Sequence, residues 1–232
     1  MNEDFKLLVN NNAGLNDSFS ALSYYIDFFY RNKLQLSNLH FSTTYGDLNQ
    51  YLTFKKIKYL EKPELNDYTF IGKYSNARDT NLNSNNEFHI SNFIEIKNDI
   101  KDNIQTYPDH VAVHFRFMNL ESNKEYINSE LKFYLDCFQK IYNKFERYLI
   151  FSDSNIINLY FENFENDNII LLTPDTTINH STAGKQKTRK NYLYKTICDL
   201  YTMSKCKTIY KTKGGFVNSA CIFNKKIIIQ KL

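Results

Sequence analysis

The 232-residue sequence contains no tryptophan, three prolines, six glycines and no apolar run long enough to cross a bilayer. So little proline and glycine argues against a linker-rich or fibrous protein. No basic stretch followed by an apolar core opens the chain, so no secretory signal is expected. With no apolar window of about 18 residues, no transmembrane helix is expected either. These absences predict a cytoplasmic protein, whose contact with a membrane, if any, is peripheral and at the inner face.

Cysteine is sparse, and basic charge is only mildly in excess. Cys137, Cys198, Cys206 and Cys221 form neither a CxxC pair nor a zinc-finger spacing. We therefore expect reduced, mostly buried thiols and no metal site. The formal net charge is +4, which suits an anionic ligand or a membrane surface. No nucleic-acid partner is expected, because such binders carry a denser basic stripe.

Apolar and aromatic residues are abundant, and in the second part of the chain they follow an alternating pattern. Hydrophobic residues make up 42% of the chain and aromatic residues 16%, which is ample material for a core. From residue 109 onward, short apolar strands alternate with amphipathic helices, which predicts a parallel, doubly wound sheet with helices on both faces. The strands are expected over 111–113, 147–151, 168–172, 207–210 and 227–229, and the helices over 129–145, 155–164 and 192–204.

The first part of the chain opens like a nucleotide-binding unit. A strand over 5–9 leads through a turn at Gly14 to a helix over 19–30, which Asp17 or Ser18 is expected to cap. The stretch from 34 to 108 is harder to interpret; we expect strands over 39–43, 69–72 and 88–94 and helices over 47–54 and 94–104. Tyr107 and Pro108 mark a boundary, so we expect one unit over 1–108 and another over 109–232.

Residues 109–119 are the stretch around which the site is predicted. Here the central strand ends in His114 and Arg116, which are two residues apart and therefore on one face. In open α/β sheets, ligands bind at the carboxyl ends of the strands. Arginine can bind a phosphate through two parallel hydrogen bonds, in bidentate geometry. We therefore expect Arg116 to hold a diphosphate; the alternative is a strand end whose charges simply meet water.

Three further stretches follow predicted strands at the same edge. They are Ser152-Asp153-Ser154, the basic loop 173–191 and the turn from Gly214 to Ser219. A glycine-containing turn exposes backbone N–H groups to an anion. Each also has a simpler interpretation, as a helix cap, a solvated loop or a plain turn. Their shared position at strand ends favours a common site.

Several of these stretches carry a resemblance to a known family. Val111–Arg116 ends in His-x-Arg, Tyr148–Asp153 ends in Ser-Asp, and Cys198–Ala220 combines an Asp-led helix, a short strand and a Phe-containing turn. Ala13–Asp17 matches in the opening turn. In this order they resemble the GDP-fucosyltransferase-like superfamily, which includes bacterial α1,2-, nodulation-type α1,6- and protein O-fucosyltransferases.

The resemblance implies a GT-B-like α/β fold, with two Rossmann-like halves of mainly parallel sheet and a cleft between them. It implies that Arg116 binds the donor β-phosphate, that His114 lies near the ribose or base, and that Asp199 helps to fix guanine. The remaining implied donor-binding residues are Asp153, Gly215, Phe216, Val217, Asn218 and Ser219, with Gly14 and Asn16 from the other half. Asp17 is the candidate catalytic base, although capping its helix is an alternative role.

The function expected from these features is a glycosyltransferase of surface-polysaccharide or glycan biosynthesis. It would transfer fucose or a related sugar from a GDP-linked donor to a glycan acceptor, with inversion and with neither a metal nor a further cofactor. Two alternatives stay open: another nucleotide-sugar-dependent transferase, such as a heptosyl or pyruvyl transferase, and a non-catalytic nucleotide- or sugar-binding protein.

Overall fold

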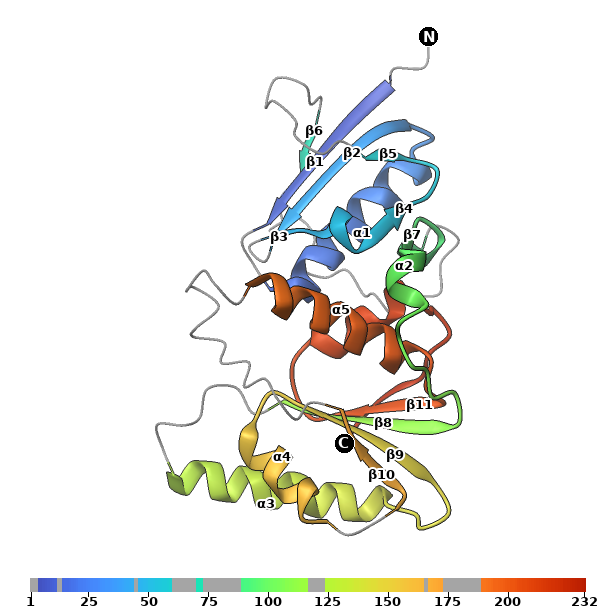
Figure 1. Cartoon of the computed structure of the whole chain (residues 1–232). Helices are drawn as coiled ribbons and strands as arrows, with labels where there is room; N and C mark the ends of the chain where they lie inside the picture. The colour runs from blue at the N-terminus through green and yellow to red at the C-terminus, as the bar shows by residue number, and fades with distance from the viewer. Residues whose placement is uncertain are drawn as a thin grey trace.

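A computed structural model describes residues 4–11, 14–43, 46–59, 70–72, 89–116, 124–164, 167–172 and 189–232. Two five-stranded sheets dominate these residues. Figure 1 shows helices α1 (Leu15–Arg31) and α5 (Arg189–Ser204) between the two sheets, with α3 (Lys124–Ile141) and α4 (Asn155–Glu162) on the far face of the second sheet. The fold is therefore α/β and layered, as the alternating pattern predicts.

The first sheet has the order β3-β2-β1-β6, with β5 also paired to β2. All its pairings are parallel except that of β3 with β2. This confirms the strand expected over 5–9 and the strands at 39–43 and 69–72. Its strands are β1 (Asp4–Asn11), β2 (Gln35–Thr43), β3 (Gly46–Asp47), β5 (Lys58–Tyr59) and β6 (Phe70–Gly72).

Helix α1 connects β1 to β2 and begins four residues earlier than the sequence predicts. Its N-cap is Gly14, in an ordinary extended conformation without a side-chain cap, so the expected cap at Asp17 or Ser18 is wrong. Asp17 lies in the first turn instead, and the Ser18 hydroxyl donates to the Gly14 carbonyl at 3.1 Å. The physical reason is burial: Leu15 is buried, so packing extends the helix back past the polar residues.

Three sequence expectations for residues 47–104 are wrong. The helix expected over 47–54 is a 3-10 turn, η1 (Leu48–Gln50), followed by β4 (Leu52–Phe54). The strand expected over 88–94 is described from 89 onward, and there it is mostly a 3-10 turn, η4 (Ile90–Asn92). The helix expected over 94–104 is β7 (Ile94–Ile96) followed by the single turn α2 (Asn98–Lys101). The cause is non-local, because Leu52 pairs with Ile96 and Phe54 with Ile94 in an antiparallel ribbon.

The second sheet has the order β10-β9-β8-β11-β12, and every pairing in it is parallel. This confirms the parallel sheet predicted from residue 109 onward. The fourth connection is a 3-10 helix, η7 (Phe216–Ile222), between the last two strands. The strands are β8 (His110–Phe115), β9 (Arg147–Ser152), β10 (Ile169–Leu171), β11 (Thr208–Lys211) and β12 (Ile229–Lys231).

Alternate side chains of the second sheet pack into two different cores. Val111 and Val113 of β8 join a cluster with Phe138 of α3 and Phe161 of α4. Ala112 between them joins the larger cluster, to which α1, α5 and η7 contribute. The strands are therefore covered on both faces, which explains why they read as apolar runs. The larger cluster runs continuously between the two sheets.

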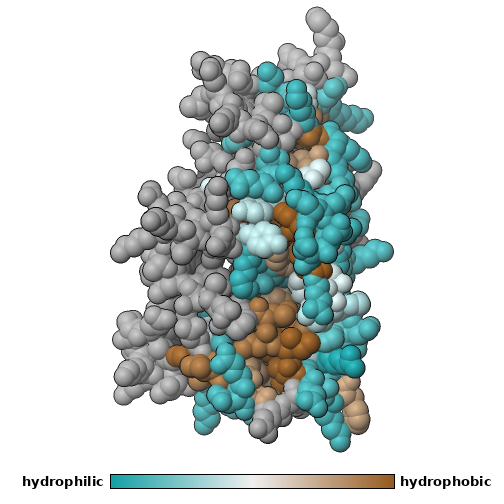
Figure 2. Space-filling view, viewed as in Figure 1, coloured by the Kyte–Doolittle hydropathy of each residue, from teal (hydrophilic) through white to brown (hydrophobic). Residues whose placement is uncertain are grey.

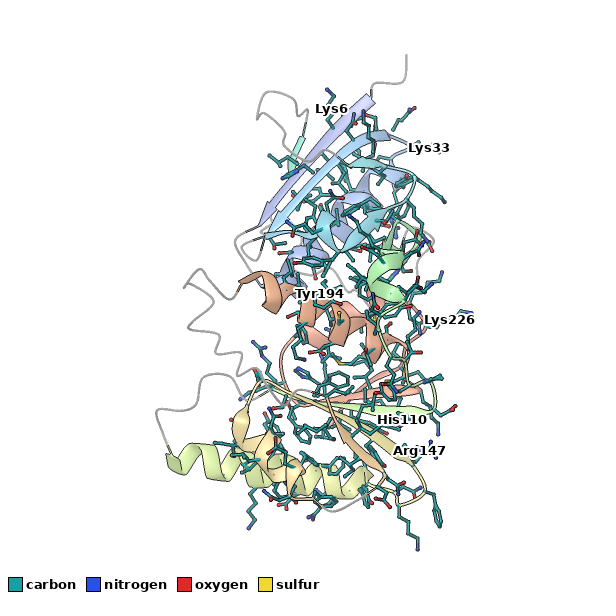
Figure 3. All side chains as sticks on the ribbon, in the orientation of Figure 1. Lys6, Lys33, His110, Arg147, Tyr194 and Lys226 are labelled. Carbon is teal, nitrogen blue, oxygen red and sulfur yellow. The ribbon has the colours of Figure 1, made fainter. Side chains whose placement is uncertain are left out.

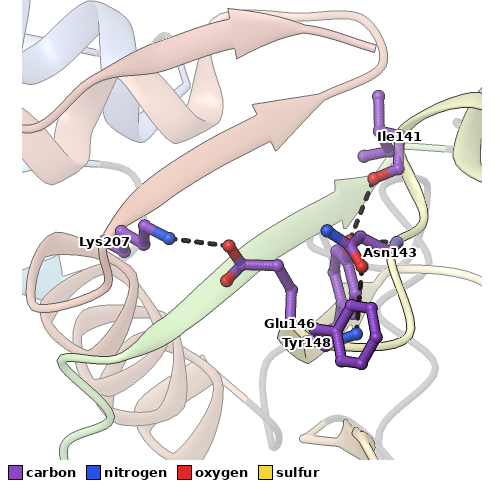
Figure 4. A network of polar contacts seen from close by, with 6 residues as sticks. Ile141, Asn143, Glu146, Tyr148 and Lys207 are labelled. Atoms are coloured by element: carbon purple, nitrogen blue, oxygen red, sulfur yellow. Dashed lines mark hydrogen bonds and ion pairs between the residues drawn. The ribbon is translucent and has the colours of Figure 1, made fainter.

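Hydrogen bonds stabilise the amino edge of the second sheet, which is the end where its strands begin (Figure 4). The Tyr148 hydroxyl donates to the Ile141 carbonyl at 2.9 Å and accepts from the Asn143 N–H at 2.8 Å. Lys207 and Glu146 form an exposed ion pair at 2.7 Å. These contacts hold the end of α3 against the start of β9, and the edge is thus braced at the end opposite the predicted site.

Strand β10 forms one border of the second sheet, and its three residues are half-buried. Figure 2 shows apolar surface in this part of the molecule. The four cysteines, all among the described residues, form no disulfide with one another, and burial raises the pKa of Cys206 and Cys221 to about 12. Within the residues that the structure describes, no helix has both the length and the apolar character needed to cross a membrane.

Candidate functional site

The strand order of the second sheet reverses between β8 and β11. From β8 the chain adds β9 and β10 on one side, and it then returns to place β11 and β12 on the other. Such a reversal separates the two flanking connections and opens a crevice at the carboxyl ends of the two strands. The residues directly after β8 and β11 therefore occupy the position where this class of sheet binds ligands.

Arg116 follows β8 at this reversal and is held there from two sides. Its backbone N–H donates to the Thr212 hydroxyl at 2.8 Å, and the Thr212 N–H donates to the His114 carbonyl at 3.1 Å. Its guanidinium Nη1 lies 3.4 Å from Asp153 Oδ2, after β9. Both side chains are largely buried, at 14% and 11% exposed. The guanidinium is thus oriented before any ligand arrives.

The turn after β11 packs against the side chain of the same arginine. Gly214 has a φ of +83°, which disfavours any residue with a side chain, and a Cβ there would touch the Arg116 side chain at 3.8 Å. Lys211 Nζ donates to the Gly214 carbonyl at 3.0 Å and to Asn218 Oδ1 at 2.7 Å. Lys213 forms an ion pair with Glu130 of α3. Lys211 and Lys213 therefore both fix the position of the turn.

The start of α1, from the other sheet, meets this turn. The Ser219 hydroxyl donates to Asn16 Oδ1 at 3.3 Å. A Cβ on Gly215 would lie 2.7 Å from Asn16 Nδ2 and 3.1 Å from Asn16 Cγ. Gly14 lies beside Asp17, because a Cβ on Gly14 would lie 3.5 Å from Asp17 Oδ2. Asn16 of the opening turn thus lies against Gly215 and Ser219 of the later turn, so the structure brings two separately predicted stretches together.

Replacing Gly215 by alanine is expected to destabilise the protein by about 0.5–1.5 kcal/mol, the net contribution of one hydrogen bond, because the new Cβ overlaps the amide end of the Asn16 side chain. That side chain would have to rotate, which breaks its bond with Ser219. Urea unfolding followed by circular dichroism measures the loss. Asn16→Ala combined with Gly215→Ala should recover most of it, since the overlapping amide is gone. A Gly215→Ala variant as stable as wild type would contradict the close approach.

His114 contributes no positive charge to the site at neutral pH. The residue is 5% exposed, and the centroid of its ring lies 5.3 Å from that of the Phe216 ring. Burial lowers the pKa of His114 to about 4. Within the described part of the chain, its buried Nδ1 has no hydrogen-bond partner. The two basic residues of the predicted motif therefore differ, and only Arg116 is a cation.

Asp199 lies on α5, near the end of β10, in a pair of its own. Lys195 Nζ contacts its two carboxylate oxygens at 2.8 and 3.0 Å and also donates to the Leu172 carbonyl at 3.4 Å. Burial raises the pKa of Asp199 to about 6, although Lys195 lowers it. The expected Asp-led helix is wrong, because α5 begins at Arg189. Asp199 and Arg116 thus belong to two separate ion pairs.

The remaining predicted residues are placed as follows. Val217 is buried, Phe216 is half-buried, and both lie in η7. Most of the basic loop, from 173 to 188 with His180, Lys185 and Lys187, lies outside the described residues.

Tyr194 of α5 lies at the boundary between the two sheets (Figure 3), with its ring centroid 6.0 Å from that of Tyr51. No group of three potential metal ligands occurs in the described ranges.

Sequence reasoning missed four residues that build this site. Thr212, Lys211, Lys213 and Glu130 position Arg116 and the turn. The first three form Lys-Thr-Lys directly before the two glycines, at the end of a predicted strand, and this placement is a signal that sequence reasoning can use. Glu130 gives no such signal, since it stands 83 residues from its partner Lys213.

Comparison with known proteins shows the fold. No family model matches the chain, and no curated protein sequence matches it significantly. Solved structures do match. NodZ α-1,6-fucosyltransferase soaked with GDP-fucose aligns with a TM-score of 0.59 and 11% identity, covering 95% of this chain and 93% of that chain. The chain has a fucosyltransferase fold.

Two further structures align equally well. Fucosyltransferase NodZ from Bradyrhizobium gives a TM-score of 0.60 at 12% identity, covering 94% of this chain and 92% of that chain. NodZ co-crystallised with GDP gives 0.58 at 12% identity, with coverage of 94% and 92%. The similarity to these fucosyltransferases is thus a similarity of fold, and it extends over almost the whole length of both chains.

Proposed function

We propose that the chain is a glycosyltransferase that transfers fucose or a related sugar from a GDP-linked donor to a glycan or surface-polysaccharide acceptor. One observation carries the proposal. Arg116, the Gly214–Ser219 turn and Asn16 converge where the parallel sheet reverses its order. The fucosyltransferase fold supports it, because structures with this fold were obtained with GDP-fucose and with GDP.

In this proposal the chain works as two Rossmann-like halves of a GT-B arrangement, 1–108 and 109–232, with the reactants in a cleft between them. The second half binds the nucleotide sugar, and the first half binds the acceptor. Gly14 and Asn16 approach the donor from the first half. The contact of Asn16 with Ser219 supports this arrangement, since it joins the two halves at the carboxyl edge of the second sheet.

The difficult step is departure of the nucleoside diphosphate, whose negative charge grows as the glycosidic bond breaks. Arg116 would bind the β-phosphate in two-pronged geometry and stabilise that charge. The backbone of residues 215–217, with Asn218 and Ser219, would contact the diphosphate. Asp153 would orient Arg116. His114 and Phe216 form a neutral pair of tilted rings in contact, which we assign to the ribose or base side.

Inversion requires a base that takes the proton from the acceptor hydroxyl as it attacks the anomeric carbon. We assign this role to Asp17, whose carboxylate lies beside Gly14 at the start of α1. Asp199, fixed by Lys195, is assigned to the guanine side. The proposed mechanism uses neither a metal nor a further cofactor. We place the enzyme in the cytoplasm. Cell fractionation would test whether it attaches to the inner face of the membrane.

Calorimetric titration of the wild-type protein with GDP, UDP, ADP and CMP tests the proposal. We expect GDP to bind and the other three nucleotides to bind at least tenfold more weakly. In a separate turnover assay, we expect slow release of GDP from GDP-fucose in the presence of a suitable glycan. Preference for another nucleotide would point to a different transferase on this fold. GDP binding without turnover across donor and acceptor panels would point to a non-catalytic binding protein. Absence of any nucleotide binding would refute the site.

A further inference from the structure

Three of the cations at the carboxyl edge of the second sheet are neutralised by partners of their own. Arg116 pairs with Asp153, Lys195 with Asp199, and Lys213 with Glu130. Each of these six side chains is at least partly buried, so each pair interacts more strongly than it would in bulk water. The three pairs contribute no net charge, whereas a nucleoside diphosphate carries at least two negative charges. The pairs alone therefore leave the proposed ligand's charge uncompensated.

Lys211 differs from these three cations. Its ammonium group donates to two neutral oxygens, the Gly214 carbonyl and Asn218 Oδ1. Among the residues that the structure describes, it forms no ion pair. An ammonium group has three donors, so one remains for a further acceptor. Burial lowers the pKa of Lys211, which means that the fold places this charge where water solvates it poorly.

A second lysine places another positive charge beside Lys211. Lys231 of β12 is the direct cross-strand neighbour of Lys211 of β11, so both side chains lie on the same face of the sheet. Neighbouring like charges on a sheet destabilise it, and the charge of Lys231 further lowers the pKa of Lys211. An anion bound between Lys211 and the arginine would relieve this repulsion.

The geometry places Lys211 and Arg116 on two sides of one residue. The Gly214 carbonyl accepts from Lys211, and the Arg116 side chain lies against the Gly214 Cα on the side where a Cβ would project. Lys211 is also paired in register with His114, two residues before Arg116. The two cations therefore flank the turn that is expected to hold the diphosphate.

We infer that Lys211 is a second phosphate-binding cation, which contacts the donor diphosphate with its free N–H and supplies the net positive charge that the paired cations lack. The inference rests on the proposed function and adds to it a specific residue. Lys211 keeps its bonds to Gly214 and Asn218 while it binds, so the same side chain fixes the turn and neutralises the ligand.

Calorimetric titration of GDP into three variants of Lys211 tests this role. Lys211→Met is expected to weaken GDP binding about 10- to 100-fold, the range for a hydrogen bond to a charged group. Lys211→Gln should lose as much, because its amide can still donate to the turn but carries no charge. Lys211→Arg should stay within several-fold of wild type. Lys207→Met is the matched control, since Lys207 immediately precedes the same strand at the opposite, amino edge.

The outcomes separate the inference from the function on which it rests. If wild type binds no GDP, the proposed function fails and the inference fails with it. If wild type binds GDP but Lys211→Met binds equally well, only the inference is overturned. Full affinity in Lys211→Gln would also overturn it, because bracing of the turn would then be the whole role. Thermal unfolding of each variant identifies any loss of affinity that follows from unfolding.

Discussion

Replacing Arg116 by alanine is expected to weaken GDP binding by about 30- to 4,000-fold, because removing one partner of a buried charge pair costs about 2–5 kcal/mol. Two effects add. The bidentate bond to the β-phosphate is lost, and the largely buried carboxylate of Asp153 no longer has the guanidinium of Arg116 beside it, so it repels the incoming phosphates. Turnover of the sugar donor should fall at least as far, because the charge on the leaving group grows in the transition state. Calorimetry with GDP and a donor-turnover assay measure the two losses.

Three companion variants separate these effects. Arg116→Ala combined with Asp153→Asn removes the repelling charge and should recover part of the affinity. Arg116→Lys keeps the charge but not the planar fork, so it should fall between wild type and alanine. Arg147→Ala is the matched control, because Arg147 is an exposed arginine at the amino edge of the same sheet (Figure 3). Equal losses in Arg147→Ala and Arg116→Ala would show a general charge effect and contradict the proposed site.

Replacing Lys195 by methionine is expected to reduce the free energy of unfolding by about 3–5 kcal/mol at pH 8, because a buried carboxylate loses its partner. The loss should depend on pH. The pKa of Asp199 in the fold, about 6, lies above its ordinary value of 3.8. The protonated form is therefore favoured by folding; its contribution is complete below about pH 4 and is lost as the pH rises through 6.

Without Lys195, the pKa of Asp199 rises further, since Lys195 is the group that lowers it. The deficit of the variant relative to wild type should therefore be small at pH 4 and grow as the pH rises past 6. Urea unfolding at a series of pH values measures this. Asp199→Asn combined with Lys195→Met should remove most of the pH dependence. Arg31→Met opens an exposed pair of the same i,i+4 spacing with Asp27 and should leave the unfolding midpoint nearly unchanged.

The site combines residues that local sequence reveals with residues that it conceals. His114 and Arg116 are visible because an apolar strand runs directly into them, and the glycine turn is visible from its composition. Their charge states are not visible. Burial makes His114 neutral, and the pairing of Arg116 with Asp153 joins two strand ends. The net charge of the site therefore follows from packing and not from a count of basic residues.

Sequence alone determined the strands of the second sheet, because alternating strands and amphipathic helices are local patterns. Each strand from β8 to β11 lies within a residue or two of its predicted limits. Only the tertiary structure decided the β4–β7 ribbon, whose strands pair across some forty residues, and the start of α1 at Leu15. It also decided the contact of Asn16 with the Gly215 turn and the pairing of Lys213 with Glu130. The physical reason is the same throughout: hydrophobic period and turn chemistry act over a few residues, whereas these contacts join segments that only the packed core brings together.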